Sequence, residues 1–322
     1  MHKRRVNELT LDLIIEPQGP ILIKSGKDAG ADPGLPAMSF VRTLHPVTGE
    51  RTIYLPGSSL KGVLRSHSER IIRTVFANDP KACCDPLSKN DSCWARHRDV
   101  KETAEQYQSL CLACKIFGHM VNAGHLRTAD AYPAQAMDAL PVRNGVAIDR
   151  LSGGVAVGPF DMEVAVEGKF ETRLSLINFE LWQVGLLALA LRDLAEGRLP
   201  LGFAKTRGLG QVQATFGRLE IAYPGTFAAG DIAAVLYGVG ALAPDLVDAY
   251  GYIKEDQRAY TTPGTLVPES VAWGRPAVRF GHTIDGPLTG LNGEAAQQAH
   301  AAIKEVLQVT VAAWAEKAGR HG

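Results

Sequence analysis

The five cysteines of the chain fall within one short stretch, and thiols so close together are candidate metal ligands. Cys111 and Cys114 form a CxxC pair, and Cys84 and Cys93 complete a set of four. Zinc prefers such a tetrahedral thiolate shell, and a small polar insertion needs the free energy of metal binding in order to fold. The spacing therefore predicts a structural Zn²⁺ site in an insertion at about residues 80–118.

The composition of this cluster leaves alternatives open. Cys83 or His97 is a possible substitute for one of the four ligands, and the plain alternative is a set of free buried thiols. A catalytic zinc needs an open coordination position and a nearby base. The chain has no HExxH motif, so we interpret the site as structural.

A second candidate site, for phosphate, lies at Tyr54–Arg73, which reads YLPGSSLKGVLRSHSERIIR. A turn at Pro56-Gly57 opens a helix of apolar periodicity, and Ser58 and Ser59 are expected to cap it. The free amides and the macrodipole of a helix N-terminus attract phosphate. An ordinary capped amphipathic helix explains the same pattern.

A third candidate is the glycine-rich stretch Leu201–Gln213, LGFAKTRGLGQVQ. Its glycines allow the backbone to approach a polyanion closely, and Lys205 and Arg207 lie between them. An ordinary turn is the alternative.

The elements that position these candidates alternate in a recognisable order. Glu8–Glu16 reads as a strand, the helix from Ser58 ends near residues 78–80, and Phe179–Glu196 reads as a helix buried nearly all round. A strand at Gln211–Tyr223 closes the series. Strand, helix, strand, strand, helix, strand is the ferredoxin-like pattern.

Between the two helices, the sequence predicts a protruding β-hairpin. Alternating runs at Gly158–Val166 and Phe170–Ile177 flank a turn signal at Glu167-Gly168. The polar stretch Ile148–Gly154 precedes them. Asp149 beside Arg150 there is read most simply as an ion pair at a turn.

Composition limits the class of protein. The 322 residues suggest one large or two modest domains, and 46% hydrophobic residues suffice for a core. A net charge of zero argues against a globally basic nucleic-acid binder but permits a basic groove. Without a long apolar run or a signal peptide, we expect a soluble, cytoplasmic protein with no membrane contact.

Four segments occur in an order that resembles one family, the RAMP superfamily of CRISPR-associated proteins. They are LPGSSLKGVLR at Leu55–Arg65, CKIFG at Cys114–Gly118, IDRLSGG at Ile148–Gly154 and KTRGLGQ at Lys205–Gln211. The resemblance is greatest to the Cas-seven-like backbone subunit of type III effectors, and the type IV backbone subunit is also similar.

The resemblance implies an α+β fold with a ferredoxin-like (RRM-like) palm over residues 1–225. It carries the zinc-bearing insertion, a thumb hairpin at about residues 138–170 and a C-terminal helical extension at 226–322 whose role is not indicated. It also implies stacking along a CRISPR guide RNA (crRNA), contact with complementary target RNA, with copies of itself and with other effector subunits. The RNA-facing positions implied are Ser58, Ser59, Lys61, Arg65, Arg42, Arg150, Lys205, Arg207, Gly208 and Gly210.

Target cleavage is where the sequence departs from the cleaving members of the family. Ala37 stands where they carry an aspartate, and Asp28 and Asp32 in the same loop are possible substitutes. A Mg²⁺-dependent cut needs a carboxylate to place the ion. Whether the chain is an enzyme is therefore left open.

Three functions follow from the resemblance. The chain is a type III backbone subunit, a non-catalytic type IV backbone subunit, or a guide-RNA-processing endoribonuclease of the same superfamily. The last would use a histidine as acid or base, and the available residues are His45, His67, His119 and His125.

Overall fold

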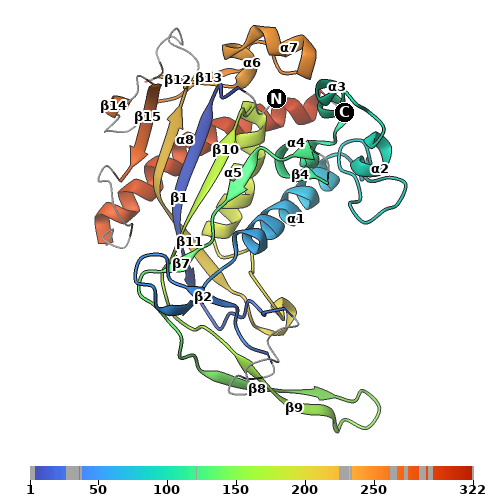
Figure 1. Cartoon of the computed structure of the whole chain (residues 1–322), viewed down its shortest axis with the longest axis vertical. Coiled ribbons are helices and arrows are strands. Elements are labelled where there is room, and N and C mark those ends of the chain that lie inside the picture. Colours follow the sequence, from blue (N-terminus) through green and yellow to red (C-terminus); the bar gives the residue numbers. More distant parts are fainter. Residues whose placement is uncertain are drawn as a thin grey trace.

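A single antiparallel sheet organises the computed structural model (Figure 1). The structure describes residues 4–26, 36, 38–120, 122–224, 232, 234–261, 267–271, 275–282, 288 and 293–320. The sheet runs in the order β14-β15-β11-β1-β10-β6, with β7 also paired to β10. No helix in the described ranges is long and apolar enough to cross a membrane.

The core of the sheet has ferredoxin-like topology. In chain order its units are β1 (Glu8–Pro17), α1 (Gly57–Val75), β6 (Leu126–Thr128), β10 (Phe170–Ile177), α5 (Leu181–Ala195) and β11 (Val212–Ala222). The four strands lie in the order β11-β1-β10-β6, which is fourth, first, third, second. The predicted α+β, ferredoxin-like fold class is confirmed.

The C-terminal region enlarges this palm. β14 (Val267–Val271) and β15 (Arg275–Gly281) extend the sheet beyond β11, and α8 (Gly293–Gly319) crosses the helical face. α5 and α8 approach closely at Gly185, where an added Cβ would lie 2.2 Å from the carbonyl oxygen of Thr310. The periodicity of α5 predicted its burial, but not that α8 provides the second cover.

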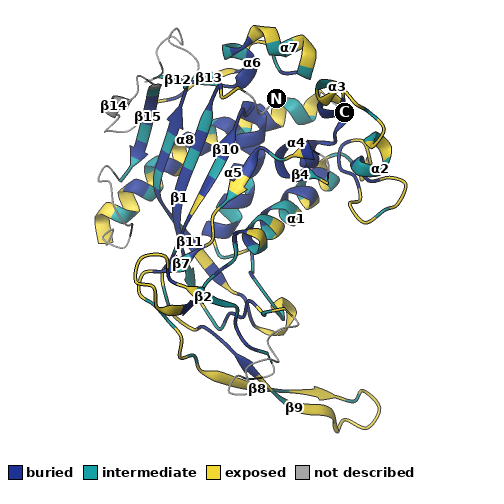
Figure 2. Cartoon of the chain, in the orientation of Figure 1, coloured by how far each residue is buried: buried dark blue, intermediate teal, exposed yellow. Residues whose placement is uncertain are grey.

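The protruding hairpin is formed by other residues than the turn signal suggested. β8 (Val142–Ile148) pairs with β9 (Val155–Glu163), and the turn lies at residues 149–154. β10 instead pairs with β1 and with β6 inside the palm. The expected hairpin turn at Glu167-Gly168 was therefore wrong, whereas a hairpin within residues 138–170 is present and extends away from the palm (Figures 1 and 2).

Short elements complete the chain. The stretch between α1 and β6 holds α2 (Cys93–His97), α3 (Thr103–Ser109), α4 (Leu112–Phe117), β4 (Gly118–His119) and β5 (Asn122–Ala123). Elsewhere lie β2 (Arg42–Leu44), β3 (Arg51–Ile53), β7 (Tyr132–Pro133), the 3-10 turn η2 (Lys205–Arg207), β12 (Val235–Tyr237), α6 (Val239–Leu242), α7 (Pro244–Tyr250) and β13 (Gln257–Ala259).

Candidate metal centre and nucleic-acid interface

Four cysteine thiols meet inside the insertion. The Sγ atoms of Cys84, Cys93, Cys111 and Cys114 all lie within 4.8 Å of one another, and all four residues are buried. Zn–S bonds of about 2.3 Å in a tetrahedron separate the sulfur atoms by about 3.8 Å. The Sγ atoms of Cys84 and Cys114 lie 3.7 Å apart. The donor set and its spacing fit a structural zinc ion.

Hydrogen bonds within the cluster favour the thiolate form at Cys84, Cys93 and Cys111, whose pKa values are lowered, and raise the pKa of Cys114. The backbone amides of Cys111 and Cys114 donate to the Sγ atoms of Cys93 and Cys111, at 3.3 and 3.4 Å. Hydrogen bonds with the Cys111 and Cys114 thiols, and with the Cys111 backbone, lower the pKa of Cys93 to about 7. Arg65 and Arg96 direct guanidinium groups at Cys114 Sγ and Cys93 Sγ, at 3.5 and 3.6 Å. Two cations thus oppose the negative charge of a four-thiolate shell.

The two substitute ligands lie outside this cluster. Cys83 is buried, but its thiol points to the backbone oxygen of Cys84 at 3.9 Å, and burial raises its pKa to about 12. His97 is not among the four grouped ligands. The geometry therefore selects the four cysteines of the predicted set.

The start of α1 differs from the expected cap. Pro56 is the N-cap residue, and neither Ser58 nor Ser59 accepts a capping hydrogen bond, so their predicted capping role was wrong. The Gly57 amide instead donates to Oδ1 of Asp130 at 2.7 Å. Asp130 comes from the loop after β6, a distance in sequence that no local capping signal reaches. The negative charge of its carboxylate interacts favourably with the positive end of the helix macrodipole.

A solvent-open hollow lies beside the first turns of α1. Its cationic and polar lining includes Ser58, Lys61, Arg65, His119 and Arg127, with Gly118, Gly124 and Thr128 in its floor and walls. The hollow joins α1 to the β4–β5 turn and to the edge strand β6. It brings together three of the residues implied to face RNA and adds His119 and Arg127, which spacing alone did not connect to them.

The cations of this hollow also hold the fold. Nζ of Lys61 donates to the carbonyl oxygen of Leu126 at 2.8 Å, and burial lowers its pKa. Arg65 donates to Glu69 Oε1 at 2.8 Å and to the Gly118 carbonyl oxygen at 2.9 Å. Arg65 therefore connects the hollow to the cysteine cluster through Cys114.

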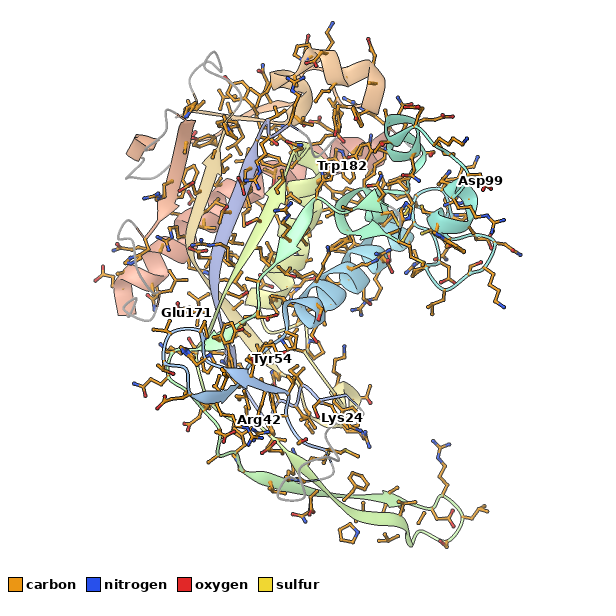
Figure 3. All side chains as sticks on the ribbon, in the orientation of Figure 1. Lys24, Arg42, Tyr54, Asp99, Glu171 and Trp182 are labelled. Carbon is orange, nitrogen blue, oxygen red and sulfur yellow. The ribbon has the colours of Figure 1, made fainter. Side chains whose placement is uncertain are left out.

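Arg42 does not have the geometry of an RNA ligand. Its side chain, labelled in Figure 3, is 7% exposed. It lies 2.5 Å from Glu163 and 2.6 Å from Asp138. Hydrogen bonds to Glu163 raise its pKa. Because Glu163 ends β9, this ion pair fixes the base of the hairpin to β2. We assign Arg42 a structural role in place of the implied RNA contact.

The glycine loop presents two exposed cations. Lys205 and Arg207 are exposed on η2, and Gly208 and Gly210 have φ angles of 82° and 95°. Two cations lie over the Phe203 ring as cation–π contacts, Arg207 at 5.3 Å and Lys24 at 5.8 Å from the ring centroid. Lys24, missed by the sequence reasoning, thus joins the loop cations.

This loop lies next to the base of the hairpin. The amides of Phe203 and Gly210 donate to the carbonyl oxygens of Leu22 and Pro20. The same segment pairs with Ala165, just after β9, through Ile21. The glycine loop and the hairpin base are therefore held together by residues 20–24.

Hydrogen bonds to the side chain of Asp149 stabilise the turn at the tip of the hairpin. Its carboxylate accepts from the Leu151 amide at 2.9 Å and from the Ser152 hydroxyl at 3.0 Å, and these bonds lower its pKa. Arg150 is exposed beside it. Asp149 thus has turn partners rather than the ion pair with Arg150 that the simplest reading suggested.

The residues considered for target cleavage, Asp28, Asp32 and Ala37, lie outside the described residues. Of the histidines considered for guide processing, His45 is buried on the carbonyl oxygen of Pro133, and His67 pairs with Asp193 at 2.6 Å. His125 is buried and stacked on Tyr107. His119 is the one of these four that lines the hollow.

A ferredoxin-like palm, an insertion with four clustered cysteines and a long exposed hairpin together define the architecture of this chain, and a comparison with protein families assigns it to one of them. The model described as "RAMPs: RAMP superfamily" matches residues 15–213. The chain belongs to the RAMP superfamily. This membership supports a CRISPR-associated, RNA-binding role. No curated protein sequence matches the chain.

Proposed function

We propose that the chain is a guide-RNA-binding backbone subunit of a CRISPR effector and that it stacks in several copies along the guide. The observation that carries this proposal is the exposed hairpin. Residues 150–159 are all exposed, and Val146, Ile148, Leu151 and Val157 are 47%, 56%, 98% and 64% exposed. An isolated two-stranded hairpin is marginal in water, and clustered exposed apolar side chains indicate an interaction surface.

Local charge supports the RNA part of the proposal. The chain is neutral overall, so general electrostatic attraction does not bring RNA to it. Lys24, Lys205 and Arg207 are instead concentrated next to the hairpin base, and Lys61 and Arg127 line the α1 hollow. Contacts of this kind read phosphate and shape, which suits a protein that must accept any guide sequence.

The test compares two leucines of nearly equal exposure. Leu151 at the hairpin tip is 98% exposed, and Leu87 in the insertion is 89% exposed. Native mass spectrometry should count more copies of the wild-type chain on a longer RNA. Leu151→Asp should abolish this length-dependent stacking while single-copy binding remains, and Leu87→Asp should behave as wild type. Equal loss in both variants, or stacking by Leu151→Asp, would overturn the proposal.

Target cleavage, and with it type III rather than type IV character, is a separate part of the proposal. We propose that the wild-type chain binds complementary RNA without cutting it, because Ala37 offers no metal ligand. The assembled complex with labelled target RNA and Mg²⁺ should give regularly spaced cuts only after Ala37→Asp. Cuts by the chain with Ala37 intact would indicate that Asp28 or Asp32 supplies the metal-binding carboxylate. No cuts in either form would favour a type IV backbone.

One observation favours guide processing as a second candidate function. His119 shares the hollow with Lys61 and Arg65, and burial lowers its pKa, which favours the neutral imidazole that can accept a proton. Metal-independent cleavage of precursor RNA that disappears in His119→Ala would establish this function. If the wild-type chain does not cleave precursor RNA in the presence of EDTA, guide processing is excluded and only the backbone role remains.

A further inference from the structure

A second cationic cavity lies on a different part of the insertion and is not used by the proposed RNA path. It encloses about 460 Å³ between α2, α3, α4 and the end of α8. Its lining includes Lys81, Arg96, His97, Lys115 and Lys317, with Asp79 as the single carboxylate among the described residues that line it. It shares no lining residue with the α1 hollow. Cavities of this size hold small molecules of up to nucleotide size.

Two lysines line this cavity, and neither makes an ion pair within 4 Å with a carboxylate of the described residues, although the charge of Glu180 acts on Lys115 and that of Asp256 on Lys317. Nζ of Lys115 lies 5.3 Å from the ring centroid of Tyr107, and Nζ of Lys317 lies 5.7 Å from that of Trp182. Both lysines are half-buried. Aromatic faces orient the two ammonium groups but do not neutralise them. Placing like charges together in a partly dry site is unfavourable unless an anion joins them.

The remaining lining groups add donors. Nε2 of His97 is buried and has no hydrogen-bond partner within the described part of the chain. Asp79 accepts from the backbone amide of Lys81 at 2.9 Å, so its carboxylate is engaged in its own turn. Arg96 is held by Pro80 and Cys93 and contributes charge. Leu110 and Leu112 form an apolar wall.

We propose that this cavity binds the phosphate groups of a small molecule of up to nucleotide size. Several convergent cations with one engaged carboxylate suit an anion of more than one charge, because ammonium groups bind phosphate as point charges. The site extends the function of the chain beyond guide binding, and nothing in it depends on the α1 hollow.

Isothermal titration of the purified, zinc-loaded full chain with inorganic pyrophosphate, ADP and adenosine tests the proposal. Pyrophosphate and ADP should bind at about one per chain, and adenosine should not bind. The relative affinities of pyrophosphate and ADP decide whether a nucleotide or a free polyphosphate is the better ligand. Lys115→Met/Lys317→Met should weaken binding at least tenfold.

Matched variants keep the test decisive. Lys89→Met/Lys304→Met removes two exposed lysines elsewhere and should bind as wild type. If Lys115→Met fails to fold, Lys81→Met/Lys317→Met should still weaken binding several-fold. Zinc content is measured after the titration, because pyrophosphate can chelate zinc. Heat that is accompanied by loss of zinc would mean that pyrophosphate extracted the metal and did not bind the cavity, which would refute the proposal. Unaltered affinity in the cavity variants, or displacement of pyrophosphate by a short RNA at one common site, would also overturn it.

Discussion

The insertion and the hairpin are both additions to the same palm, and neither is large enough to bury a hydrophobic core of its own. Their side chains are arranged in opposite ways. The insertion directs its four thiols inward, where all are buried, whereas the hairpin between β8 and β9 leaves nearly every side chain in solvent. Figure 2 makes the contrast visible, with the hairpin yellow along its outer length. The four thiols of the first addition can be closed by a metal ion, and we propose that the second is completed by a partner. Stability and assembly should therefore respond to different substitutions.

The largest effect is expected at the metal site. Cys111→Ser should remove zinc and unfold the insertion, because binding of structural zinc contributes on the order of 10 kcal/mol to folding. Elemental analysis and thermal denaturation measure this loss. Cys83→Ser is the matched control, since Cys83 is equally buried but lies outside the four-thiol group. Retention of zinc by Cys111→Ser would break the comparison.

A smaller loss is expected at the root of the hairpin. Arg42→Met leaves Glu163 buried without its guanidinium partner, which should cost about 3–5 kcal/mol. Arg51→Met is the control, because Arg51 is half exposed and lies 3.6 Å from Asp138. Urea denaturation distinguishes the two variants. Equal stability of both would mean that the hairpin base is not anchored by this ion pair.

At the hairpin tip, the change in stability should be the smallest of the three regions. Leu151→Asp replaces an exposed side chain, so the free energy of unfolding should change by no more than about 0.5 kcal/mol. The same variant is the one expected to lose stacking on RNA. A stability loss above about 2 kcal/mol would show that the tip is part of the folded core of the isolated chain.

A substitution where the C-terminal extension contacts the palm calibrates these effects, because it touches neither the insertion nor the hairpin. Burial raises the pKa of Asp256, which accepts from the Leu181 amide at the start of α5, to about 7. The unfolded carboxyl titrates near 3.9, so the folded state loses stability as pH rises from about 4 to 7.

Asp256→Asn keeps an acceptor and removes this loss. Its Tm advantage over the wild type should grow between pH 5 and pH 7 and then level off, reaching about 2–5 °C. Scanning calorimetry at pH 5.5 and pH 8 measures the difference. An advantage that shrinks as pH rises would contradict the raised pKa.

Local patterns in the sequence predicted the features that local physics controls. The period of α1 and α5, the alternation of β1 and the cysteine spacing each depend on neighbours within a few turns of chain. They predicted the palm and the four thiol ligands. β15 carries a similar signal, but it lies in a Gly- and Pro-rich region and was not identified.

The errors involve contacts between distant residues. Asp130 caps α1 from beyond the insertion, and Glu163 pairs with Arg42 from the last residue of β9, so neither contact leaves a local signal. The prediction of a hairpin turn at Glu167-Gly168 was wrong for another reason. The run Gly158–Val166 alternates in the same way as the palm strand Phe170–Ile177, but most of its residues belong to the exposed strand β9, which pairs with β8.

The two-sided role of Arg65 has a thermodynamic consequence. One guanidinium group touches Cys114 Sγ on the metal side and lines the hollow on the other. Coupling between two ligands through a shared group is reciprocal. Whatever factor zinc adds to the affinity of the hollow for an anion, that anion adds to the retention of zinc. Zinc affinity measured with and without RNA in the hollow would therefore differ by the same factor as RNA affinity measured with and without zinc.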